Sequence, residues 1–232
     1  MHNKYLGILL FSKPLKENDL FVKFISSSDE LISGIVYGGL SRKKRNLFQI
    51  GYYLNFDVSI KLNKPPVINA ELSQPFIGSI INNKYKLNCL LSVTSLINLS
   101  IIEGQKIENI YKNLDSFLNK LFFNKKWLID YHIFLFNLLK IIGYEVDYSH
   151  DIKMKYFNLE NLQFEEYRSN NSIEFPFHLL DTNNTNNDIN SEKKILEIFE
   201  TVFLKYHLSN LNLQLPNQYH LFKKLITDKI NE

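Results

Sequence analysis

The first eighty residues contain five short runs with the composition of β-strands. The runs cover residues 5–11, 20–25, 31–37, 52–61 and 67–76, and segments rich in Pro, Asn, Ser and Asp separate most of them. The fourth run alternates apolar and polar side chains, as a strand with one buried face does. Five such strands within about eighty residues predict a small closed or nearly closed barrel, and an OB-fold is the leading candidate.

The pattern changes after residue 80. Residues 85–102 carry too many apolar side chains for one face, which predicts a helix that is buried on most sides. Residues 107–123 and 127–142 repeat apolar side chains at steps of three and four, and Gly143 is a natural end for the second helix. The predicted fold class is α+β: an N-terminal OB-fold β-barrel followed by an all-helical domain with a small irregular insertion.

The same pattern predicts the domain boundaries. Residues 1–80 form the OB-fold nucleic-acid-binding domain, and residues 81–232 form the helical domain. Within the second domain, residues 148–180 are a mixed insertion that includes a weak hairpin, and the Asn-rich segment 182–190 is a polar, flexible linker. Ser191 is expected to cap the helix that follows this linker.

Four consecutive cations follow a Gly-Gly turn at the end of the third predicted strand: Arg42, Lys43, Lys44 and Arg45. The whole chain has a net charge of only +3, but residues 1–80 hold 10 Lys and Arg against 6 Asp and Glu. Loops beside an OB barrel bind nucleic acid, so this run predicts a loop that contacts phosphates. An ordinary solvated loop is the alternative.

Other side chains could extend that surface. The cations predicted to bind DNA beside the loop are Lys13, Lys23 and Lys61, although each of them alone is also typical of plain surface. Tyr37, Tyr52 and Tyr53 flank the loop and could stack on bases. Alternation places at least Tyr53 in the barrel core instead.

The sequence offers no pattern for catalysis, a cofactor or a metal. His132, His150, His207 and His220 have no Cys or His partner at metal-ligand spacing, and Cys89 is the single cysteine. The glycine motifs for phosphate and dinucleotide binding do not occur. No apolar run reaches the length of a membrane span. We therefore predict a non-enzymatic protein of a reducing cytoplasm, without cofactors.

The helical half could also contact a partner protein. Lys125, Lys126 and Lys140 lie close in sequence to apolar side chains, and a lysine-rimmed apolar slot would suit a peptide that ends in acidic and aromatic residues. The simpler interpretation is a closed helical core with surface lysines. The slot would be lined by Phe122, Phe123, Trp127 and Phe136.

Five short motifs, taken in their order along the chain, resemble the RecO family of bacterial recombination mediators. Two lie in the barrel half, and a third closes its basic loop. The fourth, a Leu-Leu-x-x-x-Gly-Tyr segment, ends a predicted helix, and the fifth precedes the last one. The motifs are Gly7–Val22, Gly34–Arg42, Leu47–Gly51, Leu138–Tyr144 and Leu211–Pro216.

The resemblance implies an OB-fold, a helical domain and no catalytic turnover. It implies binding of single- and double-stranded DNA, strand annealing, and partnership with RecR in a bacterial cytoplasm, near the nucleoid. It also implies contact with the C-terminal tail of single-stranded-DNA-binding protein and, indirectly, help in loading RecA onto gapped DNA. The family's basic loop corresponds to Arg42, Lys43 and Arg45. A protein-interaction adaptor with weak DNA contact and an RNA-binding OB-fold protein remain as alternatives.

The chain departs from the family pattern in two places. Many members hold a zinc ion with four cysteines after the Gly-Tyr segment, whereas residues 148–180 contain no cysteine, so the insertion is predicted to be metal-free. An arginine often follows the C-terminal proline of the family, whereas Asn217, Gln218 and Tyr219 stand here. The resemblance therefore carries no DNA contact over to that helix.

Overall fold

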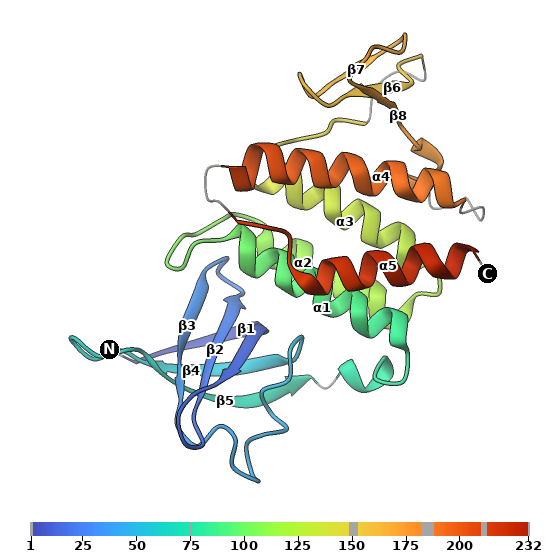
Figure 1. The fold of residues 1–232 in the computed structure, drawn as a ribbon. Coiled ribbons are helices and arrows are strands. Elements are labelled where there is room, and N and C mark those ends of the chain that lie inside the picture. The colour runs from blue at the N-terminus through green and yellow to red at the C-terminus, as the bar shows by residue number, and fades with distance from the viewer. Residues whose placement is uncertain (1, 75, 149–152, 182–187, 210–212, 232) are drawn as a thin grey trace.

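The chain folds into a barrel, a stack of helices and a small second sheet, which follow one another along the molecule (Figure 1). The structure is a computed structural model that describes residues 2–74, 76–148, 153–181, 188–209 and 213–231. The predicted α+β class is confirmed, with the strands of the barrel preceding the helices. Most of the predicted 182–190 linker lies outside the described residues, as does His150.

The first five strands close into a barrel with the order β1-β2-β3-β5-β4. Neighbouring strands are antiparallel, except that β3 and β5 run parallel where the barrel closes. This order is that of the five-stranded OB barrel that the sequence predicts. The strands are β1 (His2–Pro14), β2 (Leu20–Ser26), β3 (Leu31–Val36), β4 (Tyr53–Ser59) and β5 (Val67–Gln74).

Aromatic and branched side chains fill the barrel. The rings of Phe24 and Phe56 lie parallel inside it, with centroids 3.7 Å apart. At the closure, a Cβ on Gly34 would lie 2.5 Å from the carbonyl oxygen of Pro66. Only glycine lets β3 and the start of β5 approach this closely, so Gly34 is a requirement of the closed barrel.

Three helices follow the barrel directly, and two more complete the stack. They are α1 (Lys84–Ser100), α2 (Ile110–Phe123), α3 (Trp127–Ile141), α4 (Ile189–Val202) and α5 (Asn217–Asn231). Gly143 adopts a positive φ of 94° just beyond α3, as expected for a residue that ends a helix. A short 3₁₀ helix η1 (Phe76–Ser79) leads into α1, and a π-helical turn η3 (Phe203–Leu208) extends α4.

The barrel and the helices are joined by shared core and by hydrogen bonds. Ile8, Leu10 and Ile25 of the barrel belong to the same buried cluster as the helix interiors. The carboxylate of Asp29, in the β2–β3 turn, accepts the backbone N–H groups of Asn109 at 3.0 Å and Tyr111 at 2.9 Å. A barrel turn therefore satisfies two of the free N–H groups at the start of α2.

A second hydrogen bond links β4 to the same helix. The hydroxyl of Tyr53 donates to Asp115 Oδ1 at 2.8 Å, and its side chain is 3% exposed. Burial, together with this hydrogen bond, raises the pKa of Tyr53 well above its ordinary value, so the hydroxyl stays protonated and donates. Tyr53 is thus a core residue, as its alternation predicts.

The insertion is a regular sheet rather than an irregular segment. Three short antiparallel strands have the order β7-β6-β8: β6 (Tyr156–Asn158), β7 (Gln163–Glu165) and β8 (Ser172–Glu174). The 3₁₀ helix η2 (Phe177–Leu180) follows. Phe175 lies at the centre of an aromatic cluster, with ring centroids 5.0 Å from Phe164 and 4.7 Å from Phe177. This apolar cluster, which also includes Phe157, packs the sheet against α3.

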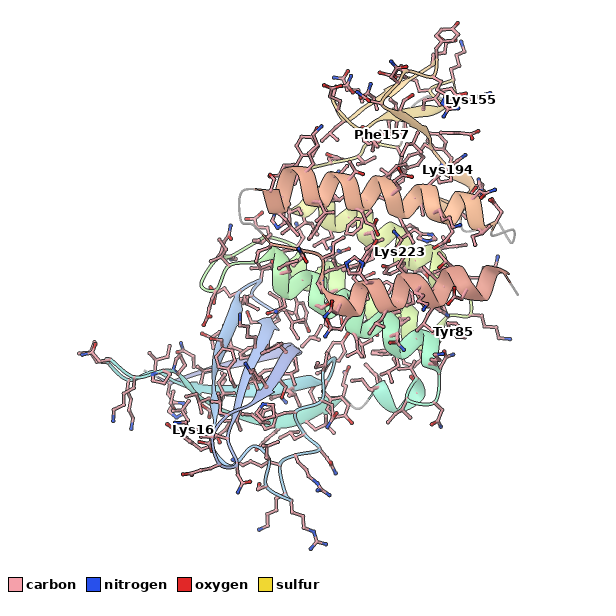
Figure 2. All side chains as sticks on the ribbon, viewed as in Figure 1. Lys16, Tyr85, Lys155, Phe157, Lys194 and Lys223 are labelled. Atoms are coloured by element: carbon pink, nitrogen blue, oxygen red, sulfur yellow. The ribbon has the colours of Figure 1, made fainter. Side chains whose placement is uncertain are left out.

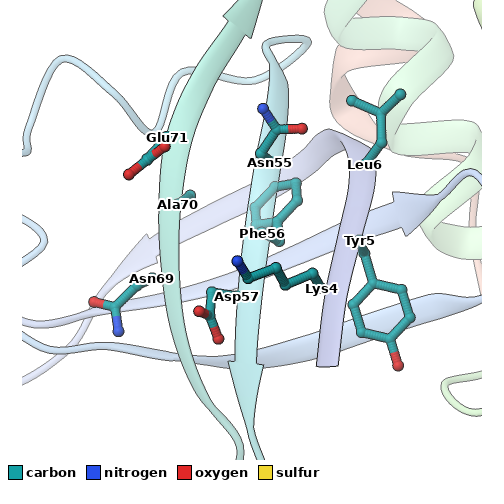
Figure 3. Close-up of a pocket in the computed structure, with 9 residues that line it drawn as sticks. All are labelled: Lys4, Tyr5, Leu6, Asn55, Phe56, Asp57, Asn69, Ala70 and Glu71. Carbon is teal, nitrogen blue, oxygen red and sulfur yellow. The ribbon is translucent and has the colours of Figure 1, made fainter. Parts of the chain in front are cut away.

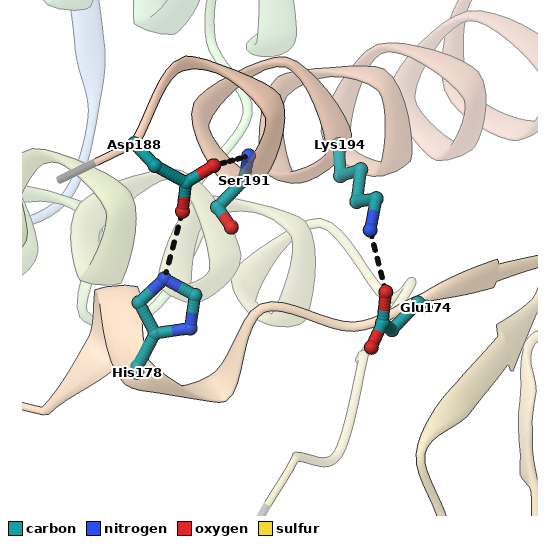
Figure 4. A network of polar contacts seen from close by, with 5 residues as sticks. All are labelled: Glu174, His178, Asp188, Ser191 and Lys194. Atoms are coloured by element: carbon teal, nitrogen blue, oxygen red, sulfur yellow. Dashed lines mark hydrogen bonds and ion pairs between the residues drawn. The ribbon is translucent and has the colours of Figure 1, made fainter.

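The start of α4 differs from the prediction that Ser191 caps it. The helix begins at Ile189, and Asp188 is its N-cap: Asp188 Oδ1 accepts the backbone N–H of Ser191 at 2.9 Å (Figure 4). The hydrogen bonds from Ser191 lower the pKa of Asp188. His178 Nε2 lies 3.4 Å from the other Asp188 oxygen, and Lys194 pairs with Glu174 at 2.6 Å, so two polar contacts tie α4 to the insertion.

Candidate nucleic-acid interface

The basic loop is held in place at both ends. Gly38 has a φ of 63° and donates its N–H to Asp19 Oδ1 at 2.8 Å, and the N–H of Leu40 donates to the carbonyl of Asn18 at 2.8 Å. At the far end, Phe48 is 4% exposed in the barrel core. Left-handed φ favours glycine, so the first glycine of the pair lets the chain turn out of β3.

Within the loop, successive turns present the cations on the surface. The N–H groups of Lys44 and Arg45 both donate to the carbonyl of Ser41, at 3.0 Å and 2.9 Å. Arg42, Lys43 and Arg45 are exposed, whereas Lys44 is half-buried and donates from Nζ to the carbonyl of Tyr37 at 3.2 Å. Three of the four predicted cations are therefore free to meet a ligand.

The charge of the loop is not neutralised from within the chain. Among the residues that the structure describes, no carboxylate forms an ion pair with residues 42–45. Asp19 is occupied by the Gly38 N–H, while Glu17 is exposed in the adjoining β1–β2 turn. Four cations against the two neighbouring carboxylates of Asp19 and Glu17 still leave a positive surface that attracts a polyanion.

Strand pairing brings two further predicted cations to this end of the barrel. Lys13, which pairs with Phe21, and Lys23, which pairs with Phe11, lie on one face of β1 and β2. This is the outer face, because Lys13 is exposed and Val22, next to Lys23, is buried in the barrel core. The β1–β2 turn that follows Lys13 carries Lys16, labelled on the barrel in Figure 2, and touches the basic loop through Asn18. These cations and the loop form one continuous surface.

Strand pairing does not place Lys61 on that surface, although the base of its hairpin meets the end of β3, where the Ile35 N–H donates to the Pro66 carbonyl. Lys61 lies in the β4–β5 hairpin just beyond Ser59, which pairs with His2 at the start of β1, whereas Lys13 lies at the end of β1. Figure 1 accordingly shows the β4–β5 hairpin projecting to one side of the barrel, apart from the loop between β3 and β4. The prediction grouped Lys61 with the loop because sequence alone does not give the register.

The opposite face of the barrel is less suited to phosphate. A hollow of about 490 Å³ on β1, β4 and β5 is lined by Lys4, Asp57, Glu71 and neighbouring side chains (Figure 3). Asp57 Oδ1 lies 2.6 Å from His2 Nδ1. Two carboxylates against one lysine give this hollow no excess of positive charge, so the candidate interface is the loop and the adjoining β1–β2 face.

The remaining candidate groups are structural. In the part of the chain that is described, no three His, Cys, Asp or Glu side chains cluster as they would around a metal. His132 is buried and lies 2.8 Å from Glu192, and burial raises the pKa of the Cys89 thiol. The predicted apolar slot is closed, because Phe122, Trp127 and Phe136 are buried and only Phe123 is exposed. No described helix has the length and apolarity to cross a bilayer.

The chain resembles proteins of known name over much of its length. Residues 84–170 match the family model described as "Recombination protein O C terminal". The DNA repair protein RecO of Rickettsia canadensis (strain McKiel) is 32% identical over 151 residues, which cover 64% of this chain and 61% of that protein.

Two further relatives give the same result. The DNA repair protein RecO of Rickettsia bellii (strain OSU 85-389) is 31% identical over 150 residues, covering 64% of this chain and 61% of the relative. That of Rickettsia akari (strain Hartford) is 31% identical over 149 residues, covering 63% and 62%. The matches thus span less than two thirds of the relatives' own length. They confirm the resemblance that the five sequence motifs indicate.

Proposed function

We propose that the chain is a member of the RecO family, to whose C-terminal model and named relatives it is similar, and that it binds DNA and acts as a recombination mediator in recombinational repair. In this proposal it binds single- and double-stranded DNA, anneals complementary strands and helps to load the recombinase onto gapped DNA. The observation that carries the proposal is the set of exposed cations on a barrel loop that is anchored at both ends and lacks acidic partners among the described residues.

The proposed mechanism is charge neutralisation and needs no acid or base. Two complementary strands repel each other through their phosphates. Arg42, Lys43 and Arg45 would contact one backbone and release its counterions, so that a second strand can approach and pair. Arginine suits this role because its planar fork binds phosphate oxygens in pairs, whichever the neighbouring base.

The proposed partners follow from the family. They are RecR, the C-terminal tail of single-stranded-DNA-binding protein and, indirectly, RecA, in the bacterial cytoplasm and near the nucleoid. The alternative is an adaptor that bridges partners and touches DNA only weakly. Only the first function requires the basic loop for repair, so loop variants distinguish the two.

We expect the variant Arg42→Ala/Lys43→Ala/Arg45→Ala to bind DNA with a weaker dependence on salt. Each lost phosphate contact removes about 0.7–0.9 from the slope of log affinity against log salt concentration, so the slope should fall in magnitude by about 2–3. The measurement is fluorescence anisotropy of labelled single-stranded and duplex DNA across a salt series.

The matched control removes the same charge from the helices. Lys84, Lys112 and Lys125 are exposed on or beside α1 and α2, and their replacement by alanine should leave the slope unchanged. A wild-type affinity that barely changes with salt, or an equal loss in both triple variants, would show that the loop does not contact phosphates.

The same loop variant should also anneal DNA more slowly. The measurement is pairing of two complementary oligonucleotides, each coated with single-stranded-DNA-binding protein, followed by energy transfer between end labels. Annealing at the wild-type rate, combined with normal repair in cells, would favour the adaptor.

A further inference from the structure

Two phenylalanines lie on the outer face of the barrel, in a place where the sequence predicts only lysines. Phe11 on β1 and Phe21 on β2 are half-buried, while their neighbours Val22 and Leu20 point into the core. Strand register pairs Phe11 with Lys23 and Phe21 with Lys13. Phenylalanine and lysine therefore alternate both along each strand and across the pair of strands.

The spacing of the two phenylalanine rings suits an extended single strand of nucleic acid. Their centroids are 6.4 Å apart and their planes are inclined by 68°. Successive phosphates of one duplex strand rise by only about 3.4 Å, so two bases on these rings would be pulled apart and splayed. Base pairing would be lost in such a geometry, which favours unpaired nucleotides.

The surface beside Phe11 has room for a base. A hollow of about 470 Å³ lies between β1, α1 and the segment before α5, and its lining includes Phe11, Ile50, Leu91 and Pro216. Asn98 also lines it, and the Oδ1 atom of Asn98 is buried and accepts no hydrogen bond from the described residues. Polar side chains line it too: Thr94, Ser95, Gln214 and Gln218. A largely apolar hollow with a buried, unpaired acceptor and a polar rim fits a flat heterocycle that carries N–H groups.

The outer face of β1 and β2 adjoins the basic loop at one end and the carboxylate of Glu103 at the other. Lys13 leads into the turn that touches the basic loop. In the other direction, Lys23 pairs with Ser33, and the hydroxyl of Ser33 donates to the carboxylate of Glu103. That carboxylate would repel phosphates, so a bound strand should run from Lys23 towards Lys13 and the loop.

We propose that the outer face of β1 and β2 is a single-strand site, on which Phe11 and Phe21 stack two unpaired bases while Lys13 and Lys23 bind the adjoining phosphates. The inference rests on the proposed function, since it requires that the protein binds DNA. It adds a preference: the basic loop accepts any backbone, whereas this face accepts only nucleotides whose bases are free.

The test compares Phe11→Leu and Phe21→Leu with wild-type protein on two probes, an oligothymidylate and a duplex hairpin of equal phosphate number. Leucine keeps apolar cover on the barrel but offers no ring for stacking. Each variant is expected to bind oligothymidylate about 5-fold to 150-fold more weakly, the effect of losing one base–aromatic stack. Duplex affinity should stay at the wild-type value, and Phe21→Tyr should keep single-strand affinity.

Phe123→Leu is the matched control, because Phe123 is exposed at the end of α2, away from the β1–β2 face. Thermal unfolding of each variant checks that the barrel is intact. Unchanged oligothymidylate affinity in both ring variants, or an equal loss on both probes, would overturn the single-strand site. Wild-type protein that binds neither probe would instead overturn the proposed function.

Discussion

Alanine in place of His132 is expected to lower the free energy of unfolding by about 3–5 kcal/mol, because it leaves a buried carboxylate without its partner. His132 on α3 is 1% exposed and Glu192 on α4 is 0% exposed, with Nε2 and Oε1 2.8 Å apart. The second oxygen, Glu192 Oε2, already has no hydrogen-bond partner among the described residues. The measurement is urea unfolding followed by far-ultraviolet circular dichroism.

Two further variants test whether the loss of stability comes from breaking the contact between His132 and Glu192. His220→Ala removes an exposed imidazole from α5, and its effect should stay within about 0.5 kcal/mol. The double variant His132→Leu/Glu192→Met replaces the pair by apolar side chains and should recover most of the lost stability, since neither position then leaves an unpaired polar group. A double variant as unstable as His132→Ala would show that shape, rather than pairing, sets the cost.

Phe175→Ala is expected to be similarly damaging, at about 3–5 kcal/mol, because it removes the centre of the aromatic cluster and opens a cavity. Phe175 is 3% exposed and has ring neighbours in Phe136, Phe157, Phe164 and Phe177. The loss should fall first on β6, β7 and β8. Hydrogen exchange of their backbone amides, together with urea unfolding, measures both effects.

The control for this variant is Tyr167→Ala, since Tyr167 is 77% exposed in the connection between β7 and β8. Its effect should be within about 0.5 kcal/mol. The aromatic cluster also predicts how the insertion responds to a chelator. If the rings hold the sheet, EDTA should leave its exchange rates unchanged, and a faster exchange would point to a bound metal instead.

Elements with a strong local pattern are close to their predicted positions. The apolar steps of three and four predict a helix at residues 127–142, and α3 spans Trp127–Ile141. Strand-like composition and turn residues likewise predict all five barrel strands, and β4 also alternates as a strand with one buried face does. The start of α4 was misplaced because Asp188 and Ser191 are both good caps, and the local sequence does not choose between them.

The candidate site was harder to predict, because it depends on which strands pair. The run of cations identifies the loop without any structure. Register, in contrast, decides that Lys23 lies beside Phe11 and that Lys61 lies at the other end of β1. The sequence assigns no role to Phe11 and Phe21, and it takes their partial exposure and their pairing with Lys23 and Lys13 to show that they lie on the outer face. The contact between His132 and Glu192 spans sixty residues and leaves no local signal.

The contacts of Asp29 and Tyr53 with α2 have a mechanical consequence. Together with the shared core beneath them, they hold the described helices against the barrel at several points, so the helices act as a lever arm of defined length and direction. Any protein docked on that arm would be carried to one defined distance and angle from a strand lying on the barrel. Delivery of a partner to DNA would then follow from geometry alone, without a conformational step.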